Sequence, residues 1–172
     1  MSKDRILDML TGDPEQGALH IKDVRYLLIR PETLIAFQKA LEAEVGFARA
    51  GEILYPGGFT GGKLSGERYR REFGLSEREA VAFMGRMGGE IGWGSFDLVV
   101  FDNDAQSIVV EVVSSPFAEA YGGGAEGGVC HLIRGVLGGL GAEIFGAEVE
   151  ALEPSCVAMG DGVCRFEVGV VG

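Results

Sequence analysis

The sequence predicts an α+β fold in which an antiparallel sheet packs against several helices. Two pairs of β-branched runs are each separated by a short polar turn, which is the pattern of a β-hairpin. Three other segments carry apolar residues at helical spacing. The elements follow in the order helix, helix, hairpin, helix, hairpin, and 172 residues suit one domain.

The first helices are predicted from their start signals. Pro31 suits a first helical turn, and apolar residues continue at helical spacing to about residue 51. The glycine-rich stretch 54–74 fits either a loop or a helix with a face of small residues, and the residues alone leave both open. Ser76 and Glu79 form a capping-box pattern, which begins a helix that ends near residue 88.

The strands are expected mainly in the second half of the chain, around an apolar helix at about residues 130–145. A flexible glycine link, 121–128, precedes this helix. The arms of the two hairpins are expected at 96–101 and 107–113, and at about 147–157 and 163–171. The run 24–29 (VRYLLI) is also compatible with a strand. Residues 1–20 are expected to form an N-terminal tail or short helix, and residues 21–172 a single domain.

Composition narrows the class of protein. A net charge of −11 argues against a nucleic-acid surface, because phosphate binding needs clustered Lys and Arg. No run of about 18 apolar residues is present, so we expect no membrane span. The polar N-terminus lacks a secretory signal, and we therefore expect a cytoplasmic protein. In that reducing compartment, three cysteines favour a metal site or free thiols over disulfides.

Glycine is unusually frequent: the chain has 29, where average composition would give roughly 7%. Glycine in a helix costs roughly 1 kcal/mol relative to alanine, so its presence needs a compensating contact. Glycines at 135, 138, 139 and 141 lie in the apolar helix and would let a neighbouring backbone or a ligand approach closely. We therefore expect a cavity between the 96–113 hairpin and the glycine-bearing helices.

The three cysteines all lie in the last third of the chain and indicate a metal site. Cys156 and Cys164 flank the turn of the last hairpin, Glu153 is near them across Pro154, and Cys130 begins the apolar helix. A helix N-terminus favours a thiolate, and zinc accepts thiolate and carboxylate ligands in a tetrahedral shell. Two alternatives remain from the residues alone: the cysteines are small buried hydrophobes, or His131 replaces Glu153 as a ligand.

The segment GGVCHLIRGVLGGLGAEIFGAEVEALEPSCVAMGDGVCRFEV resembles the C-terminal half of the 4-vinyl-reductase-type domain. This family includes the sensor domains of phenol-responsive transcription activators and shares a fold superfamily with a vesicle-tethering subunit. In the phenol sensors Cys, Glu, Cys and Cys ligate zinc, and their spacings of 23, 3 and 8 match Cys130, Glu153, Cys156 and Cys164. The resemblance therefore implies a closed structural zinc site. RPETLIAFQKALEAEVGFARAGEILYPGGFTGG is similar to a long helical segment of those sensors, which favours a helix there.

The resemblance also implies a ligand pocket between the helices and the sheet. Arg86 and Val112 fall near the positions of the histidine and tryptophan that hold the phenol hydroxyl in the sensors, so neither residue is retained. The expected pocket residues are Phe83, Arg86, Trp93, Phe96, Val112, Phe117 and Tyr121.

These patterns lead to one main functional hypothesis and two alternatives. The chain is expected to be a stand-alone sensor-like module that binds a small hydrophobic or aromatic molecule, holds a structural zinc, forms a homodimer through its N-terminal third and signals through a partner protein. The alternatives are an accessory protein of tetrapyrrole or bacteriochlorophyll synthesis and a structural adaptor that acts through its surface. No arrangement of catalytic residues is recognised, so an enzyme is less expected.

Overall fold

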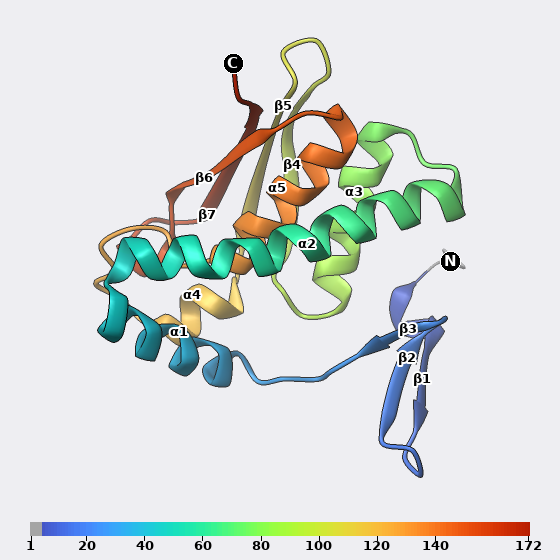
Figure 1. The fold of residues 1–172 in the computed structure, drawn as a ribbon, viewed down its shortest axis with the longest axis horizontal. Coiled ribbons are helices and arrows are strands. Elements are labelled where there is room, and N and C mark those ends of the chain that lie inside the picture. Colours follow the sequence, from blue (N-terminus) through green and yellow to red (C-terminus); the bar gives the residue numbers. More distant parts are fainter. Residues whose placement is uncertain (1–4) are drawn as a thin grey trace.

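The computed structural model describes residues 5–172 and confirms the predicted α+β class (Figure 1). A four-stranded antiparallel sheet has the order β4-β5-β7-β6, and helices cover one of its faces. Its strands are β4 (Ser95–Asp102), β5 (Ser107–Val113), β6 (Val149–Ser155) and β7 (Cys164–Val170). The helices are α1 (Pro31–Val45), α2 (Phe47–Phe73), α3 (Glu77–Glu90), α4 (Pro116–Tyr121) and α5 (His131–Phe145), with short 3-10 turns η1 (Ile6–Met9) and η2 (Val157–Met159).

The core lies between the sheet and α5, which is itself crossed by α2 (Figure 1). Ile133 and Leu140 of α5 are completely buried, and they pack in the same core as Phe166 of β7 and Val112 of β5. The strand alternation explains this arrangement, because every second residue of β5 and β7 faces the helices. The helix α5 is therefore the element that both the sheet and the outer helix layer share.

The helix expected from residue 31 to about 51 is divided in the structure. Gly46 has φ +85°, a conformation that favours glycine, and it ends α1 and precedes α2. The ambiguous stretch 54–74 is helical: α2 runs through Pro56 and ends at Gly74, which adopts the left-handed conformation. The glycines that made this segment ambiguous face α5, and the reason becomes clear from the contacts described below.

The N-terminal residues form a small sheet, which corrects the expectation of a tail or short helix over residues 1–20. Strands β1 (Leu10–Asp13), β2 (Ala18–Ile21) and β3 (Val24–Tyr26) are antiparallel, so the expected boundary after residue 20 falls inside β2. The turn at Asp13, which accepts hydrogen bonds from the N–H groups of residues 15 and 16, joins two strands and does not end a tail. Residues 1–4 of this expected tail lie outside the described part of the chain.

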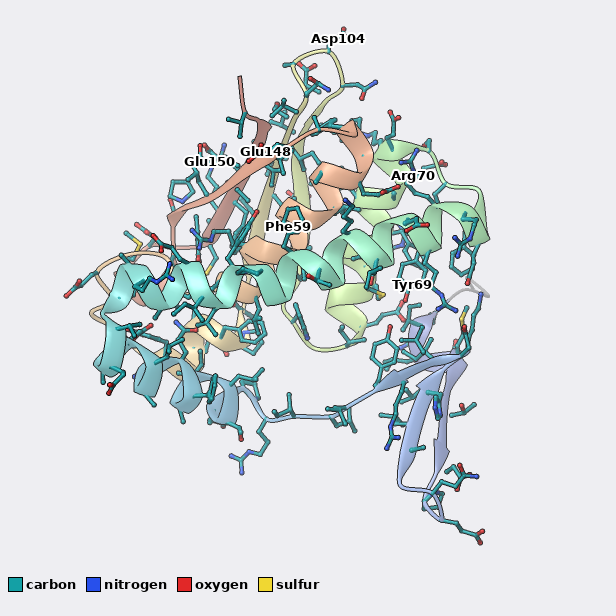
Figure 2. The ribbon with its side chains drawn as sticks, in the orientation of Figure 1. Phe59, Tyr69, Arg70, Asp104, Glu148 and Glu150 are labelled. Carbon is teal, nitrogen blue, oxygen red and sulfur yellow. The ribbon has the colours of Figure 1, made fainter. Side chains whose placement is uncertain are left out.

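The small sheet is attached to the end of α2 by polar contacts. Asp23 forms an ion pair with Arg68, and Lys22 lies 2.9 Å from Glu72. The Tyr26 and Tyr69 hydroxyls are 3.2 Å apart, and Figure 2 shows Tyr69 pointing from α2 toward the small sheet.

The strand predicted for residues 24–29 ends at Tyr26. Residues 27–30 continue as an extended connection to α1, and the side chains of Leu27 and Leu28 are 81% and 87% exposed. The short helix α4 was not predicted, although Pro116 is in its first turn and the Ser115 side chain caps it. None of the helices in residues 5–172 is long and apolar enough to cross a membrane.

Candidate metal centre and ligand cavity

Four side chains from three elements converge at one end of α5. Cys130 is the residue before the helix, Glu153 lies in β6, Cys156 follows β6 and Cys164 begins β7. One ligand atom from each of these residues lies within 4.8 Å of the others. The final hairpin positions Cys156 and Cys164, since its turn returns the chain on itself, and the packing of α5 on the sheet brings Cys130 to the same point.

The distances between the sulfur atoms suit a tetrahedral metal site. Cys164 Sγ lies 3.8 Å from Cys130 Sγ and 3.7 Å from Cys156 Sγ, whereas a disulfide would need about 2.05 Å. With Zn–S bonds of about 2.3 Å, two thiolates of a tetrahedron are roughly 3.8 Å apart. The cluster therefore has the spacing that a zinc ion would require of its sulfur ligands.

Glu153 supplies a carboxylate with one oxygen free to bind. Its Oε2 accepts a hydrogen bond of 2.8 Å from the Cys130 backbone N–H. Its Oε1 is buried and has no hydrogen-bond partner within residues 5–172. A buried polar atom without a partner is costly, and a cation at the centre of the cluster would satisfy it. The donor set of three sulfurs and one oxygen thus fits zinc.

The electrostatics of the cluster favour a bound cation. Burial, with the nearby Cys156, raises the pKa of Glu153 to about 9. Hydrogen bonding to Cys156 and Cys164, together with burial, raises the pKa of Cys130 above its ordinary range. Hydrogen bonds from Cys130 and Cys156 lower the pKa of Cys164 to about 4. Without a metal the cluster retains protons, which a divalent cation would displace.

Neighbouring groups orient these ligands. The completely buried Ser115 hydroxyl lies 3.2 Å from Cys130 Sγ, and the Val157 N–H points at Cys164 Sγ from 3.5 Å. The Asp161 carboxylate accepts a hydrogen bond from the Cys156 N–H. Such partners fix the geometry of ligands around a metal.

His131 stands outside this cluster, although it is adjacent to Cys130 in sequence. Its ring is buried against Gly51 and packs edge-on to Phe47. Burial lowers its pKa to about 4, so the ring is neutral at pH 7. The alternative in which His131 replaces Glu153 as a ligand is therefore not the arrangement that the structure adopts.

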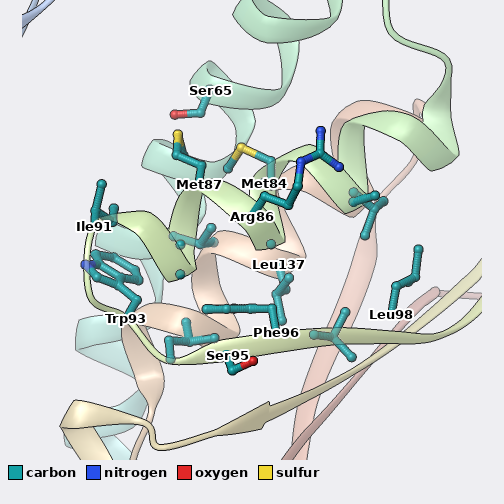
Figure 3. Close-up of a pocket in the computed structure, with 18 of the residues that line it drawn as sticks. Ser65, Met84, Arg86, Met87, Ile91, Trp93, Ser95, Phe96, Leu98 and Leu137 are labelled. Carbon is teal, nitrogen blue, oxygen red and sulfur yellow. The ribbon is translucent and has the colours of Figure 1, made fainter. Parts of the chain in front are cut away.

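A second feature is a cavity of about 570 Å³ between α3, β4 and α5. Figure 3 shows Phe96 and Leu98 extending from β4, with Met84, Arg86 and Met87 on the α3 side. Most of its lining is apolar, and the remaining wall comes from α2, α5 and the loop before β4: Gly61, Ser65, Ile91, Trp93, Ile133, Val136 and Leu137.

The structure brings three of the predicted pocket residues, Arg86, Trp93 and Phe96, to this cavity. The other four lie elsewhere. Phe83 packs with Tyr69 and Phe73, Val112 is buried beneath Gly94, Phe117 supports Trp93 edge-on, and the Tyr121 hydroxyl donates to Glu42.

Sequence analysis missed the residues that contribute most of the apolar wall. Met84, Met87 and Leu98 are among them. The helical spacing of Met84 and Met87 and the alternation of Phe96 with Leu98 would have indicated this shared face.

The glycines of α5 face away from the cavity. A Cβ at Gly135 or Gly139 would collide with the backbone of α2, and one at Gly141 would meet Val168. Gly58 and Gly62 of α2 oppose the α5 backbone in the same manner. Of the two possibilities expected for these glycines, close approach of a backbone is correct.

Comparison with known families agrees with this architecture. The profile of the family described as activator of aromatic catabolism matches residues 6–104, and that of the vinyl-4-reductase domain matches residues 108–170. The chain belongs to the activator-of-aromatic-catabolism family, and the predicted relationship to 4-vinyl-reductase-type sensor domains is confirmed. No individually curated protein is significantly similar to the chain in sequence.

Solved structures show the same fold. The phenol-responsive sensory domain of the transcription activator PoxR, solved with phenol, is 19% identical, with a TM-score of 0.82 over 96% of this chain and 86% of that chain. A vinyl-4-reductase family protein from Methanocaldococcus jannaschii is 20% identical, with a TM-score of 0.54 over 88% of this chain and 86% of that chain. Subunit 3 of a trafficking protein particle complex from Naegleria fowleri, covalently bound to palmitic acid, is 16% identical, with a TM-score of 0.54 over 83% and 95% of the two chains.

Proposed function

We propose that this chain is a sensor-like domain that binds a small hydrophobic molecule in the cavity between α3, β4 and α5. The observation that carries the proposal is the cavity itself, whose 570 Å³ volume and mostly apolar wall are typical of ligand sites. The similarity in fold to a phenol-responsive sensory domain supports the same assignment.

The second part of the proposal is a structural zinc ion held by Cys130, Glu153, Cys156 and Cys164. The sulfur spacing and the partnerless Glu153 oxygen support it. Four protein ligands leave no open position for a substrate, so the metal would stabilise the fold and not perform hydrolysis. It would join the start of α5 to both arms of the last hairpin. Free thiols at this site also favour a reducing compartment such as the cytoplasm.

The third part is a homodimer that uses the N-terminal third of the chain. Leu27, Leu28 and Phe37 are all more than half exposed, although a single chain would gain by burying them. Pairing with a second copy would cover these side chains. Sedimentation velocity at tens of micromolar should show a dimer, and Leu28→Asp should convert it to monomer. A wild-type monomer would contradict this part alone.

Mass spectrometry of solvent extracts from the purified protein tests the proposed function. We expect an apolar molecule at up to one equivalent per chain. An extract containing a tetrapyrrole would instead support an accessory role in tetrapyrrole synthesis.

A protein that yields no molecule and binds no apolar probe would support a structural adaptor. Calorimetric titration with a neutral probe such as 4-phenylphenol therefore accompanies the extraction. Together the two measurements separate a vacant cavity from one that does not bind.

A further inference from the structure

The cavity is larger than a single aromatic ring needs. A protein cavity of about 150 Å³ accommodates benzene, whereas this cavity measures about 570 Å³. Two of its walls are the flexible side chains Met84 and Met87, which adapt to irregular ligands. The volume therefore suits a molecule with more than one ring or an equivalent aliphatic body.

The cavity also has one cationic side chain without an anionic partner. Arg86 lines the cavity, and its guanidinium lies 5.6 Å from the centre of the Phe83 ring. Within residues 5–172 it forms no ion pair or hydrogen bond, whereas Arg68, Arg70 and Arg165 all lie beside carboxylates. In a chain with a net charge of −11, an arginine left unpaired beside an apolar cavity is unusual.

The only carboxylate among the described lining residues does not neutralise Arg86. Asp97 lies on β4 between Phe96 and Leu98, which both extend toward the helices (Figure 3). Because successive side chains of a strand point to opposite faces, the Asp97 carboxylate is directed to the other side of the sheet. The cavity therefore offers a ligand an apolar body site with a guanidinium at its edge.

We propose that the cavity binds a carboxylic acid whose apolar body is larger than one benzene ring, and that Arg86 binds its carboxylate. Guanidinium groups form paired, charge-assisted hydrogen bonds with carboxylates. The Ser65 hydroxyl, which also lines the cavity, adds a neutral polar group on the α2 side. This inference rests on the proposed function, because it names the class of ligand for the same cavity.

Isothermal titration calorimetry with three probes at pH 7.5 tests the inference. Biphenyl-4-carboxylate has both features, 4-phenylphenol has the same body without the charge, and benzoate has the charge with one ring. We expect the biphenyl acid to bind about tenfold or more tightly than 4-phenylphenol, because of the charge-assisted contact. It should also bind at least about tenfold more tightly than benzoate, because of the second buried ring.

Two variants identify the residue responsible. Arg86→Gln should weaken binding of the biphenyl acid by about tenfold or more and leave 4-phenylphenol within about twofold. Arg78→Gln is the matched control, since Arg78 is an exposed arginine of the same helix that does not line the cavity. It should change neither affinity. Unchanged melting temperatures would show that both variants fold.

The outcomes separate this inference from the proposed function. If 4-phenylphenol binds and the biphenyl acid binds no better, or if Arg86→Gln has no effect, the carboxylate assignment is wrong and the hydrophobic site stands. If benzoate binds as tightly as the biphenyl acid, the inferred ligand size is wrong. If no probe binds the wild-type protein, the proposed function fails and this inference fails with it.

Discussion

The two sides of α5 are packed in contrasting ways. Toward α2, Gly135 and Gly139 bring the two helix backbones into contact and leave no space between them. Toward α3 and β4, Ile133 and Leu137 of the same helix line a cavity of about 570 Å³. The comparison shows that small residues close one interface, whereas the space on the other side is left between long side chains.

This difference explains why glycine is tolerated in α2 and α5. Each helical glycine costs roughly 1 kcal/mol relative to alanine, yet larger residues at the contact would force the backbones apart. The firm α2–α5 contact fixes the position of α5. The cavity can then persist on the opposite side without being filled by movement of this helix.

The largest predicted effect comes from loss of the zinc, because it anchors the beginning of the helix that both sides share. Structural zinc binding contributes on the order of 10 kcal/mol. Cys164→Ser should therefore release the metal and lower the melting temperature by roughly 10–20 °C, the equivalent of about 5 kcal/mol. Metal analysis and thermal unfolding measure both quantities.

Glu153→Gln is the milder comparison, since three thiolates remain and water can take the fourth position. Protein prepared without chelator that contains no zinc would contradict the metal assignment.

Substitution at the closed side should have the next largest effect. A Cβ at Gly58 would collide with the Leu132 carbonyl of α5, so Gly58→Ala should destabilise the protein by about 1–3 kcal/mol. The adjacent Gly57 offers a matched control, because a Cβ there would meet no described atom within 4 Å. Gly57→Ala should stabilise by about 0.5–1 kcal/mol. Urea unfolding measures both, and equal effects would disprove the close contact.

Two leucines of α5 compare the closed and open sides directly. Leu140 is completely buried and lies against Gly66 of α2, whereas Leu137 lines the cavity. Leu140→Ala should cost about 2–5 kcal/mol. Leu137→Ala should cost less, about 1–2 kcal/mol, because its side chain already lacks neighbours on one side. The reverse order in urea unfolding would show that the two sides are packed alike.

The sequence predicted the metal cluster better than the cavity for a physical reason. Cys156 and Cys164 belong to one hairpin, and a hairpin turn brings the residues that flank it together. The cavity wall is assembled from β3, α2, α3, β4, β5 and α5, whose packing no local pattern specifies. Trp93 and Phe96 were therefore found as aromatics near the expected site, whereas Met84 was missed.

The errors in secondary structure have a similar origin. Residues 54–74 could not be assigned, because glycine disfavours an isolated helix and only contact with α5 compensates for it. The N-terminal sheet was missed because its strands have three or four residues each. Their stability depends on contacts with α2, such as that of Asp23 with Arg68.

The most direct test of the account is to fill the open side without disturbing the closed one. Leu98 extends from β4 into the cavity, so Leu98→Trp would occupy its volume. Calorimetric titration of 4-phenylphenol should show binding to the wild-type protein and at least about a tenfold loss in this variant, with zinc content and melting temperature retained. A folded, zinc-loaded variant that binds the probe as tightly as the wild type would contradict the claim that this cavity is the ligand site.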